Sequence, residues 1–417
     1  MRHGSEASAA RRRRAVAPDW TLVFLLIMLA TGYVSIAASQ MSLGLALLAL
    51  LHRWTVRHRP PPRLGIETAA ALLAGWALVM IPFSTDTAQS ALYYRRFYLF
   101  TALWVAAAAA SSERRRWLML WFLLAGALVT CLHDQALLLI RTGGLFRQRL
   151  EGNFNAMTSG ALIMMAVLTA AGFLLAPGCP RRRRLLLAVA LGPLLLALVM
   201  IMTRSAQMGV AAGAAALLLT VRPRWFAAFA LVAVIVAAAY LAVGDNLPRT
   251  GPLARLHPDY VLHDKNTTLR LEMWRGGWAM VKRHPITGVG DRGLEEISPR
   301  YYTSADGLYF GHLHSNIPHL AAIWGVPGLV LGQGFLLACL WRLRRRWQAV
   351  SAQSGGAAAA PATAGWVLAG IAVWAGFWVA GLTDWYFGDA EPMLIYLAIQ
   401  GAALARSEAG GDATSAS

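Results

Sequence analysis

The sequence predicts an all-α polytopic membrane protein of about twelve transmembrane helices, with one large loop between the ninth and the tenth. Of its 417 residues, 57% are hydrophobic and only 14% are charged, a composition that does not fit a soluble globular chain. Windows such as 156–176 and 185–202 are free of charged side chains. Windows of this length cross about 30 Å of hydrocarbon as helices, in which each backbone polar group finds its partner within the segment.

The expected helices follow the apolar windows in order along the chain. They cover residues 21–38, 41–52, 66–83, 96–111, 117–133, 155–175, 185–202, 206–221, 225–243, 316–341, 365–383 and 390–405. Basic residues 11–14 precede the first apolar run, as in a secretory signal peptide. We expect this first helix to be retained, because the run is long and no small-residue cleavage site is followed by a soluble domain.

The arginine clusters between these helices predict their orientation. With the N-terminus in the cytoplasm, 23 of the 38 Lys and Arg residues fall on the inner side, against six in short outer loops. Adding or dropping one helix would move clusters such as 181–184 and 342–346 to the outer side. The count of twelve therefore agrees with the positive-inside rule, under which Lys and Arg collect on the cytoplasmic side.

This topology divides the chain into five parts. They are a basic cytoplasmic N-terminus (1–20), nine transmembrane helices (21–243), a large outer loop (244–315), three further transmembrane helices (316–405) and a disordered cytoplasmic tail (406–417). The loop is the only soluble-like part, with nine Lys or Arg, eight Asp or Glu and five His. Within it, Leu269, Met273, Trp278 and Val281 recur at helical spacing before Pro285, which predicts an amphipathic helix on the membrane surface.

Composition and motifs exclude several classes of function. The formal net charge of +18 does not indicate nucleic-acid binding, since the arginines form short clusters between apolar runs rather than one basic surface. The three cysteines have no metal-ligand spacing and are interpreted as small apolar residues within helices. Residues 288–293 match the GxGxxG dinucleotide pattern, but no βαβ unit surrounds them, so we discard that interpretation.

Arginines in the short outer loops are candidates for binding an anion. The positive-inside rule does not expect arginines on the outer side, so these ones need another explanation. A guanidinium is a planar, permanent cation that binds phosphate oxygens through two hydrogen bonds. Arg204 lies between two apolar runs only a few residues apart, where an arginine normally pairs or binds substrate. For Arg95, Arg96 and Arg149, contact with lipid headgroups is an equally good explanation. Arg147 is a further candidate for binding an anion.

The large loop closes on His312-Leu313-His314-Ser315-Asn316. A neutral imidazole at the membrane face is suited to general-base catalysis, because the ordinary pKa of histidine is about 6.5. Zinc binding is the rival use of two histidines, but this spacing without a nearby Cys or an HExxH motif is a weak metal signal, and we expect neither metal nor cofactor. Asp384 and Asp389 follow the eleventh helix, where a carboxylate would orient a histidine, bind a sugar hydroxyl or simply cap a helix end.

The second half of the chain carries a series of short motifs. They are Thr268-Leu269-Arg270 followed by Trp274, then His284-Pro285-Ile286-Thr287-Gly288-Val289-Gly290, then His314-Ser315-Asn316, then Gly325-Val326-Pro327-Gly328. This series resembles the signature of the O-antigen ligase and polymerase superfamily. Thr203-Arg204-Ser205 is similar, more loosely, to the arginine-containing segment of that family, and the resemblance runs from about Met202 to Asp389.

The resemblance implies a GT-C-like glycosyltransferase of the Gram-negative inner membrane, with the large loop and the active site in the periplasm. In the family, an undecaprenyl-diphosphate-linked glycan is the donor and the lipid A core oligosaccharide is the acceptor, without nucleotide sugar or metal. Carried over, His314 is the catalytic base, and Arg204 and Arg270 bind the donor diphosphate. Independently of the resemblance, their place in short outer loops makes Arg147 and Arg95 further candidates for binding the diphosphate. Four further residues would orient the histidine or bind sugar: His312, Asn316, Asp384 and Asp389.

Two related activities and one unrelated function remain open at this point. An O-antigen polymerase uses the same donor with a lipid-linked glycan as acceptor, and a protein O-oligosaccharyltransferase passes the glycan to a protein such as a pilin. A transporter of lipid-linked glycans would also place arginines near helix ends. It is expected to show paired broken helices or inverted repeats, a pattern that the sequence does not display.

Overall fold

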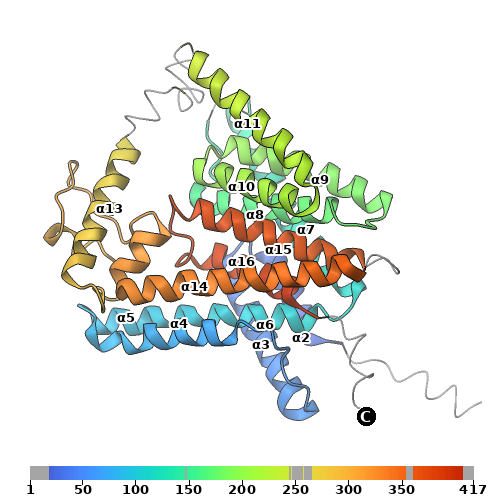
Figure 1. Cartoon of the computed structure of the whole chain (residues 1–417), viewed down its shortest axis with the longest axis horizontal. Coiled ribbons are helices and arrows are strands. Elements are labelled where there is room, and N and C mark those ends of the chain that lie inside the picture. The colour runs from blue at the N-terminus through green and yellow to red at the C-terminus, as the bar shows by residue number, and fades with distance from the viewer. Residues whose placement is uncertain are drawn as a thin grey trace, which may run out of the picture.

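The computed structural model describes residues 18–145, 148–243, 246, 257, 265–353 and 360–406, and these segments contain helices but no strand. The elements are α2 (Trp20–Thr31), α3 (Ile36–Arg57), α4 (Glu67–Val79), η1 (Ile81–Phe83), α5 (Thr87–Tyr94), η2 (Arg95–Phe100), α6 (Thr101–Ala109), α7 (Glu113–Thr142), α8 (Ala156–Leu174), α9 (Arg181–Met200), α10 (Arg204–Val221), α11 (Pro223–Val243), α13 (Lys265–Arg283), η5 (Ser298–Arg300), α14 (Asn316–Gln353), α15 (Pro361–Ala380) and α16 (Ala390–Leu404). Most of them form one bundle (Figure 1).

The helical membrane fold predicted from composition is confirmed. Among the described residues, eight helices are long and apolar enough to cross a membrane, and three shorter apolar helices accompany them. Each of the twelve predicted runs overlaps a helix, although the number that span the membrane stays a prediction. The clearest difference is α7, which extends well beyond the predicted 117–133 because Ser112 caps its first turn and Gly143 ends it in a left-handed conformation.

The centre of the bundle is built from α8, α15 and α16. α15 packs along α8, α10 and α16, and α16 packs along α6. Small residues make this close approach possible: a Cβ on Gly172 of α8 would collide with the backbone of Ala369 in α15. By contrast, α11 contacts α10 and has no buried residue within its apolar window, as expected for a helix whose surface faces lipid.

A break at Gly325 divides α14. Gly325 has φ 69° and ψ −176°, a conformation that suits glycine, and the break leaves nearby carbonyl groups without their usual helical partners. Other segments supply those partners. The indole of Trp76 donates to the Trp324 carbonyl at 2.9 Å, and the backbone N–H of Val289 donates to Ala322 at 2.8 Å. The break therefore anchors α4 and the segment after α13 to α14.

Among the described residues, arginines of several clusters lie together at one end of the bundle, which we call the arginine end. α2, α7 and α15 begin there, and α14 and α16 end there. Arg115 contacts Asp19 at 2.6 Å, while Arg116 and Arg346 donate to the carbonyl of Ala405 at 3.0 and 2.8 Å. Clusters far apart in sequence thus share one end, as the alternation of helices predicts.

The opposite end carries α13 and the segments that precede α14. Figure 1 shows α13 lying across the end of the bundle at which α14 begins. The predicted amphipathic helix is present, but its apolar residues Leu269, Met273 and Val281 are buried and the helix packs against α14. The sequence placed this face on the membrane surface, whereas the chain itself covers most of it.

Candidate active site

His314 is held in a fixed position just before α14. Its φ of 46° lies in the left-handed region, which costs energy for a residue with a side chain and persists only where the surroundings impose it. Both backbone groups of the preceding residue are bound. The indole of Trp274 donates to the Leu313 carbonyl at 2.9 Å, and the Leu313 N–H donates to Nδ1 of His319 at 3.3 Å.

Asp384 faces His314 from the loop after α15. Its Oδ1 lies 3.5 Å from Nδ1 of His314, and both side chains are largely buried. Asn316 fixes the two segments relative to each other: its N–H donates to the Gly381 carbonyl at 2.7 Å, and its side-chain oxygen accepts from the N–H groups of Tyr386 and Phe387. Asn316 thus holds the loop after α15 against the start of α14.

A cavity of about 490 Å³ opens beside this pair. Its polar lining residues include Tyr93, Arg96, Arg149, Asn155, Thr158, Asp291, Arg292, Glu295, His312, His314, Asp384 and Asp389. Cations and carboxylates therefore surround one space large enough for a phosphorylated sugar, within the usual range of about 300–1,000 Å³ for ligand pockets.

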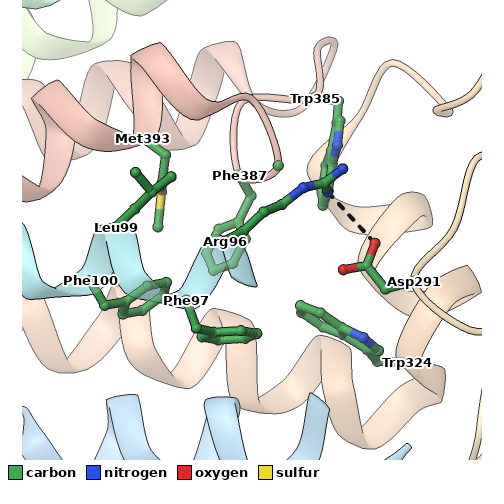
Figure 2. Close-up of a pocket in the computed structure, with 10 residues that line it drawn as sticks. Arg96, Phe97, Leu99, Phe100, Asp291, Trp324, Trp385, Phe387 and Met393 are labelled. Carbon is green, nitrogen blue, oxygen red and sulfur yellow. Dashed lines mark ion pairs between the residues drawn. The ribbon is translucent and has the colours of Figure 1, made fainter. Parts of the chain in front are cut away.

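Arg96 reaches the cavity from η2 between aromatic rings. Figure 2 shows its guanidinium directed toward Asp291, with Phe97, Trp324 and Phe387 nearby. The ion pair spans 3.6 Å. Burial raises the pKa of Asp291 to about 6, although the charge of Arg96 opposes that rise. The carboxylate is thus poorly solvated, and the guanidinium keeps donors for a second anion.

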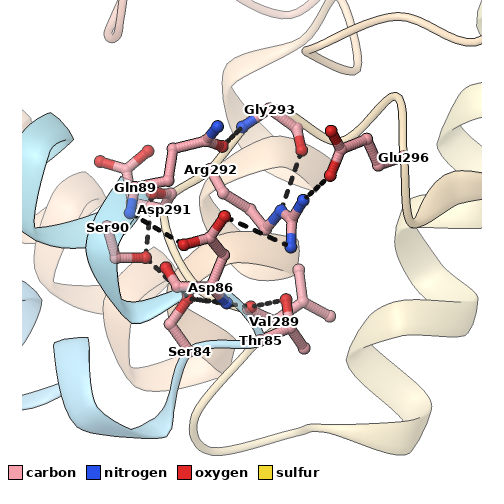
Figure 3. Close-up of polar contacts among 10 residues, drawn as sticks. All are labelled: Ser84, Thr85, Asp86, Gln89, Ser90, Val289, Asp291, Arg292, Gly293 and Glu296. Atoms are coloured by element: carbon pink, nitrogen blue, oxygen red, sulfur yellow. Dashed lines mark hydrogen bonds and ion pairs between the residues drawn. The ribbon is translucent and has the colours of Figure 1, made fainter.

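The GxGxxG segment has a structural role in this site. Figure 3 shows it bound to the residues that precede and begin α5. The Thr85 hydroxyl donates to the Val289 carbonyl at 2.9 Å, and the Gly293 N–H donates to the side chain of Gln89 at 2.6 Å. The hydroxyl of Ser90 donates to the Asp291 carbonyl at 3.0 Å. These contacts place Asp291 opposite Arg96.

Arg149 and Asp389 complete the wall on the side of α8. Arg149 donates to the Ile201 carbonyl at 2.6 Å and to the Thr203 hydroxyl at 3.0 Å, which ties it to the turn between α9 and α10. The Thr158 hydroxyl donates to Asp389 at 2.6 Å. Burial raises the pKa of Asp389, so this carboxyl holds its proton more readily than an exposed one.

His312 lies beside His314, with ring centroids 4.3 Å apart. The pKa of His312 is lowered to about 4, chiefly by burial; the charges of His314, Arg270 and Arg96 also lower it, and the charge of Asp384 opposes them. The imidazole is therefore neutral at pH 7. The charges of Arg270 in α13 and of Arg96 in η2 thus both act on His312.

Four of the nine predicted site residues line the cavity: His312, His314, Asp384 and Asp389. Arg270 and Asn316 do not line it: the charge of Arg270 acts on His312, and Asn316 binds the loop after α15. Arg204 begins α10 next to Thr203 and is half-buried outside the lining. Arg95 is exposed and does not line the cavity, and Arg147 lies outside the described residues.

Three groups of the site are also close enough to hold a metal ion. The ligand atoms of His312, His314 and Asp384 lie within 4.8 Å of one another. Two imidazoles and one carboxylate form a donor set that suits a divalent transition metal. The geometry thus fits either a histidine–aspartate pair or a metal centre, and the two uses are distinguished by experiment below.

Asp291, Asn155 and Thr158 line the cavity but were not among the predicted site residues. Asp291 sits inside a glycine pattern that is typical of an unrelated fold, and Asn155 and Thr158 carry no motif of their own. Asn155 caps α8 by accepting from the N–H groups of Met157 and Thr158, so an N-cap signal was present there. An N-cap signal alone, however, does not predict a cavity.

A comparison with protein families gives one match. The model of the family described as O-Antigen ligase matches residues 187–332, which include α9, α10, α13 and the first part of α14. No curated protein matches the chain. The matched segment contains Arg204, Arg270, His312 and His314, so the resemblance predicted from the motifs is confirmed. Over these residues, the chain is similar to the O-antigen ligase family.

Proposed function

We propose that the protein transfers a glycan from undecaprenyl diphosphate to the lipid A core oligosaccharide at the periplasmic face of a Gram-negative inner membrane. The observation that carries this proposal is the His314–Asp384 pair at the wall of a cavity that arginines also line. In the proposed topology, twelve helices span the membrane, residues 244–315 lie in the periplasm, and residues 1–20 and 406–417 lie in the cytoplasm. The arginine end then faces the cytoplasm, in agreement with the positive-inside rule.

His314 acts as the general base in this proposal. Because Asp384 faces Nδ1, the other ring nitrogen is left to accept a proton from the acceptor sugar hydroxyl. The hydroxyl oxygen attacks the anomeric carbon as its proton passes to Nε2. A new glycosidic C–O bond forms, the bond between the anomeric carbon and phosphate oxygen breaks, and undecaprenyl diphosphate leaves with the electron pair. Attack opposite the leaving group inverts the anomeric centre.

Arginines stabilise the leaving diphosphate. Arg96 and Arg149 line the cavity, and the charge of Arg270 in α13 acts on His312 in its wall, so these fixed charges would oppose the negative charge that develops on the phosphate oxygens. Arg204, implied by the family resemblance, lies next to Thr203, to which Arg149 is bound. Arg96 takes the place that the sequence assigned to Arg95.

Reconstitution with defined acceptors tests the activity. Purified protein in liposomes receives an undecaprenyl-diphosphate glycan together with lipid A core, a pilin substrate or a second carrier-linked glycan. We expect glycan on the lipid A core. Glycan on the second carrier would identify a polymerase, and glycan on the pilin would identify a protein oligosaccharyltransferase. The absence of transfer to all three would reject the proposal.

The His314→Ala variant tests the base in the same assay. Loss of general-base catalysis lowers the rate about 10²–10⁴-fold. His284→Ala is the matched control, because His284 lies in the same part of the chain and outside the cavity lining. Full activity of His314→Ala, with normal expression, would reject this assignment.

Chelation distinguishes the two uses of the histidine cluster. If His314 and Asp384 act as an orienting pair, dialysis against a strong chelator leaves the transfer rate unchanged. A loss of activity that added zinc or manganese restores would assign His312, His314 and Asp384 to a metal centre instead.

A further inference from the structure

A second large cavity lies at the arginine end, far from the candidate active site. Its volume is about 700 Å³, and it lies between the first half of α2, the second half of α3 and the start of α7. We call it the α2–α3 groove. Ser111 and Arg115 close it on the side of α7. None of its lining residues belongs to the active-site cavity.

The mouth of the groove is strongly basic. Four arginines line it, Arg53, Arg57, Arg59 and Arg115, against a single carboxylate, Asp19. Asp19 is shared, since it lies 2.6 Å from Arg115 and 4.0 Å from Arg53. One carboxylate therefore cannot neutralise the mouth. In addition, Nε of Arg53 is buried and has no hydrogen-bond partner among the described residues.

The deeper part of the groove is apolar. Phe24 of α2 and Leu45 and Leu48 of α3 line it, and Leu45 lies eight residues before Arg53 on the same helix. At about 1.5 Å per residue, the apolar lining continues for roughly 12 Å below the arginines. Leu45 and Leu48 are exposed, although both belong to a helix long and apolar enough to span the membrane.

We propose that the α2–α3 groove binds one anionic phospholipid. Its phosphate contacts Arg53 and Arg115 at the mouth, and an acyl chain lies along Leu45, Leu48 and Phe24. Charge complementarity favours this occupant, because guanidinium groups bind phosphate oxygens in pairs and basic residues at a membrane surface attract anionic lipids. A zwitterionic lipid offers no net charge to the mouth, and a soluble anion leaves the apolar part uncovered.

Native mass spectrometry tests this proposal on the whole protein. The protein is released from nanodiscs containing equal amounts of phosphatidylglycerol and phosphatidylethanolamine, and the lipids that stay bound are counted. We expect one retained phosphatidylglycerol. Equal retention of the two lipids, or displacement of the bound lipid by millimolar inorganic phosphate, would overturn the proposal.

Variants locate the lipid. Arg53→Gln/Arg115→Gln is expected to lower retention of phosphatidylglycerol at least tenfold, whereas Arg181→Gln/Arg182→Gln, two arginines of α9 outside the groove, leaves retention unchanged. Ala49→Phe fills the groove without altering charge and is expected to lower retention as well. Wild-type retention by both groove variants would overturn the proposal. The readout does not depend on glycan transfer, so it stands or falls separately from the proposed function.

Discussion

Two neighbouring arginines give the sharpest test of the site at the level of single residues. Arg96 lines the cavity and pairs with Asp291, whereas Arg95 is exposed. Lysine retains the charge of arginine but loses its two-pronged donor geometry. We expect Arg96→Lys to weaken donor binding about 10-fold or more, the value of one charged hydrogen bond, and Arg95→Lys to leave it unchanged.

The measurement is the KM for the lipid-linked donor in liposomes. An equal effect of the two substitutions would show that the arginines contribute only a general positive potential. It would also remove Arg96 from the proposed contacts with the diphosphate.

The lowered pKa of His312 predicts how the stability of the folded protein changes with pH. Its pKa is lowered to about 4 in the folded protein, against an ordinary value of about 6.5. Between these values the unfolded chain binds a proton that the folded chain does not, so this group destabilises the fold as the pH falls from 6.5 toward 4. Asp291, with a pKa raised to about 6, acts in the opposite direction. A comparison of the wild type with His312→Gln isolates the histidine.

We expect the melting temperature of the wild type to fall more than that of His312→Gln between pH 7 and pH 4.5, by about 2–4 °C. The check is thermal unfolding of both proteins in detergent at the two pH values. Parallel loss of stability in the two proteins would show that His312 is solvated rather than buried.

The break in α14 yields a prediction at the level of helices. A Cβ on Gly325 would collide with the carbonyl of Ile286, and its φ of 69° disfavours any residue with a side chain. Gly325→Ala is therefore expected to lower stability by about 1–3 kcal/mol and to loosen the segment that carries Asp291.

Gly334→Ala is the matched control, since Gly334 lies in the same helix with open space around its Cα, where alanine favours the helix. Thermal unfolding of the two variants gives the comparison. A stable Gly325→Ala protein would mean that α14 tolerates a continuous helix at this point.

Hydropathy predicts the helices because each one buries an apolar surface or exposes it to lipid, whatever its neighbours are. It does not fix their ends, which local caps decide, as Ser112 and Gly143 do for α7. The motifs and the positions of His312, His314 and Asp384 along the chain likewise predicted them as site residues. It did not distinguish Arg96 from Arg95, because that choice depends on the turn of η2 and on Asp291, almost 200 residues away.

At the scale of the whole molecule, the two ends of the bundle have different chemistry. One end holds arginines that bind carbonyl groups and Asp19. Arginines at the same end also line the α2–α3 groove. The other holds the His314–Asp384 pair and the cavity beside it. Such polarity suits an enzyme whose two substrates are both amphiphiles, since their head groups meet on one side while their lipid chains remain in the bilayer.

This polarity predicts the accessibility of single cysteines. The native cysteines Cys131, Cys179 and Cys339 are all buried, so an introduced surface cysteine supplies the labelling signal. Ala305→Cys places a thiol on the exposed segment before His312, and Ser351→Cys places one at the exposed end of α14. In spheroplasts, a membrane-impermeant maleimide is expected to label Ala305→Cys and to label Ser351→Cys only after the membrane is permeabilised. The reverse pattern would put the catalytic cavity in the cytoplasm, where a periplasmic glycan donor cannot reach it.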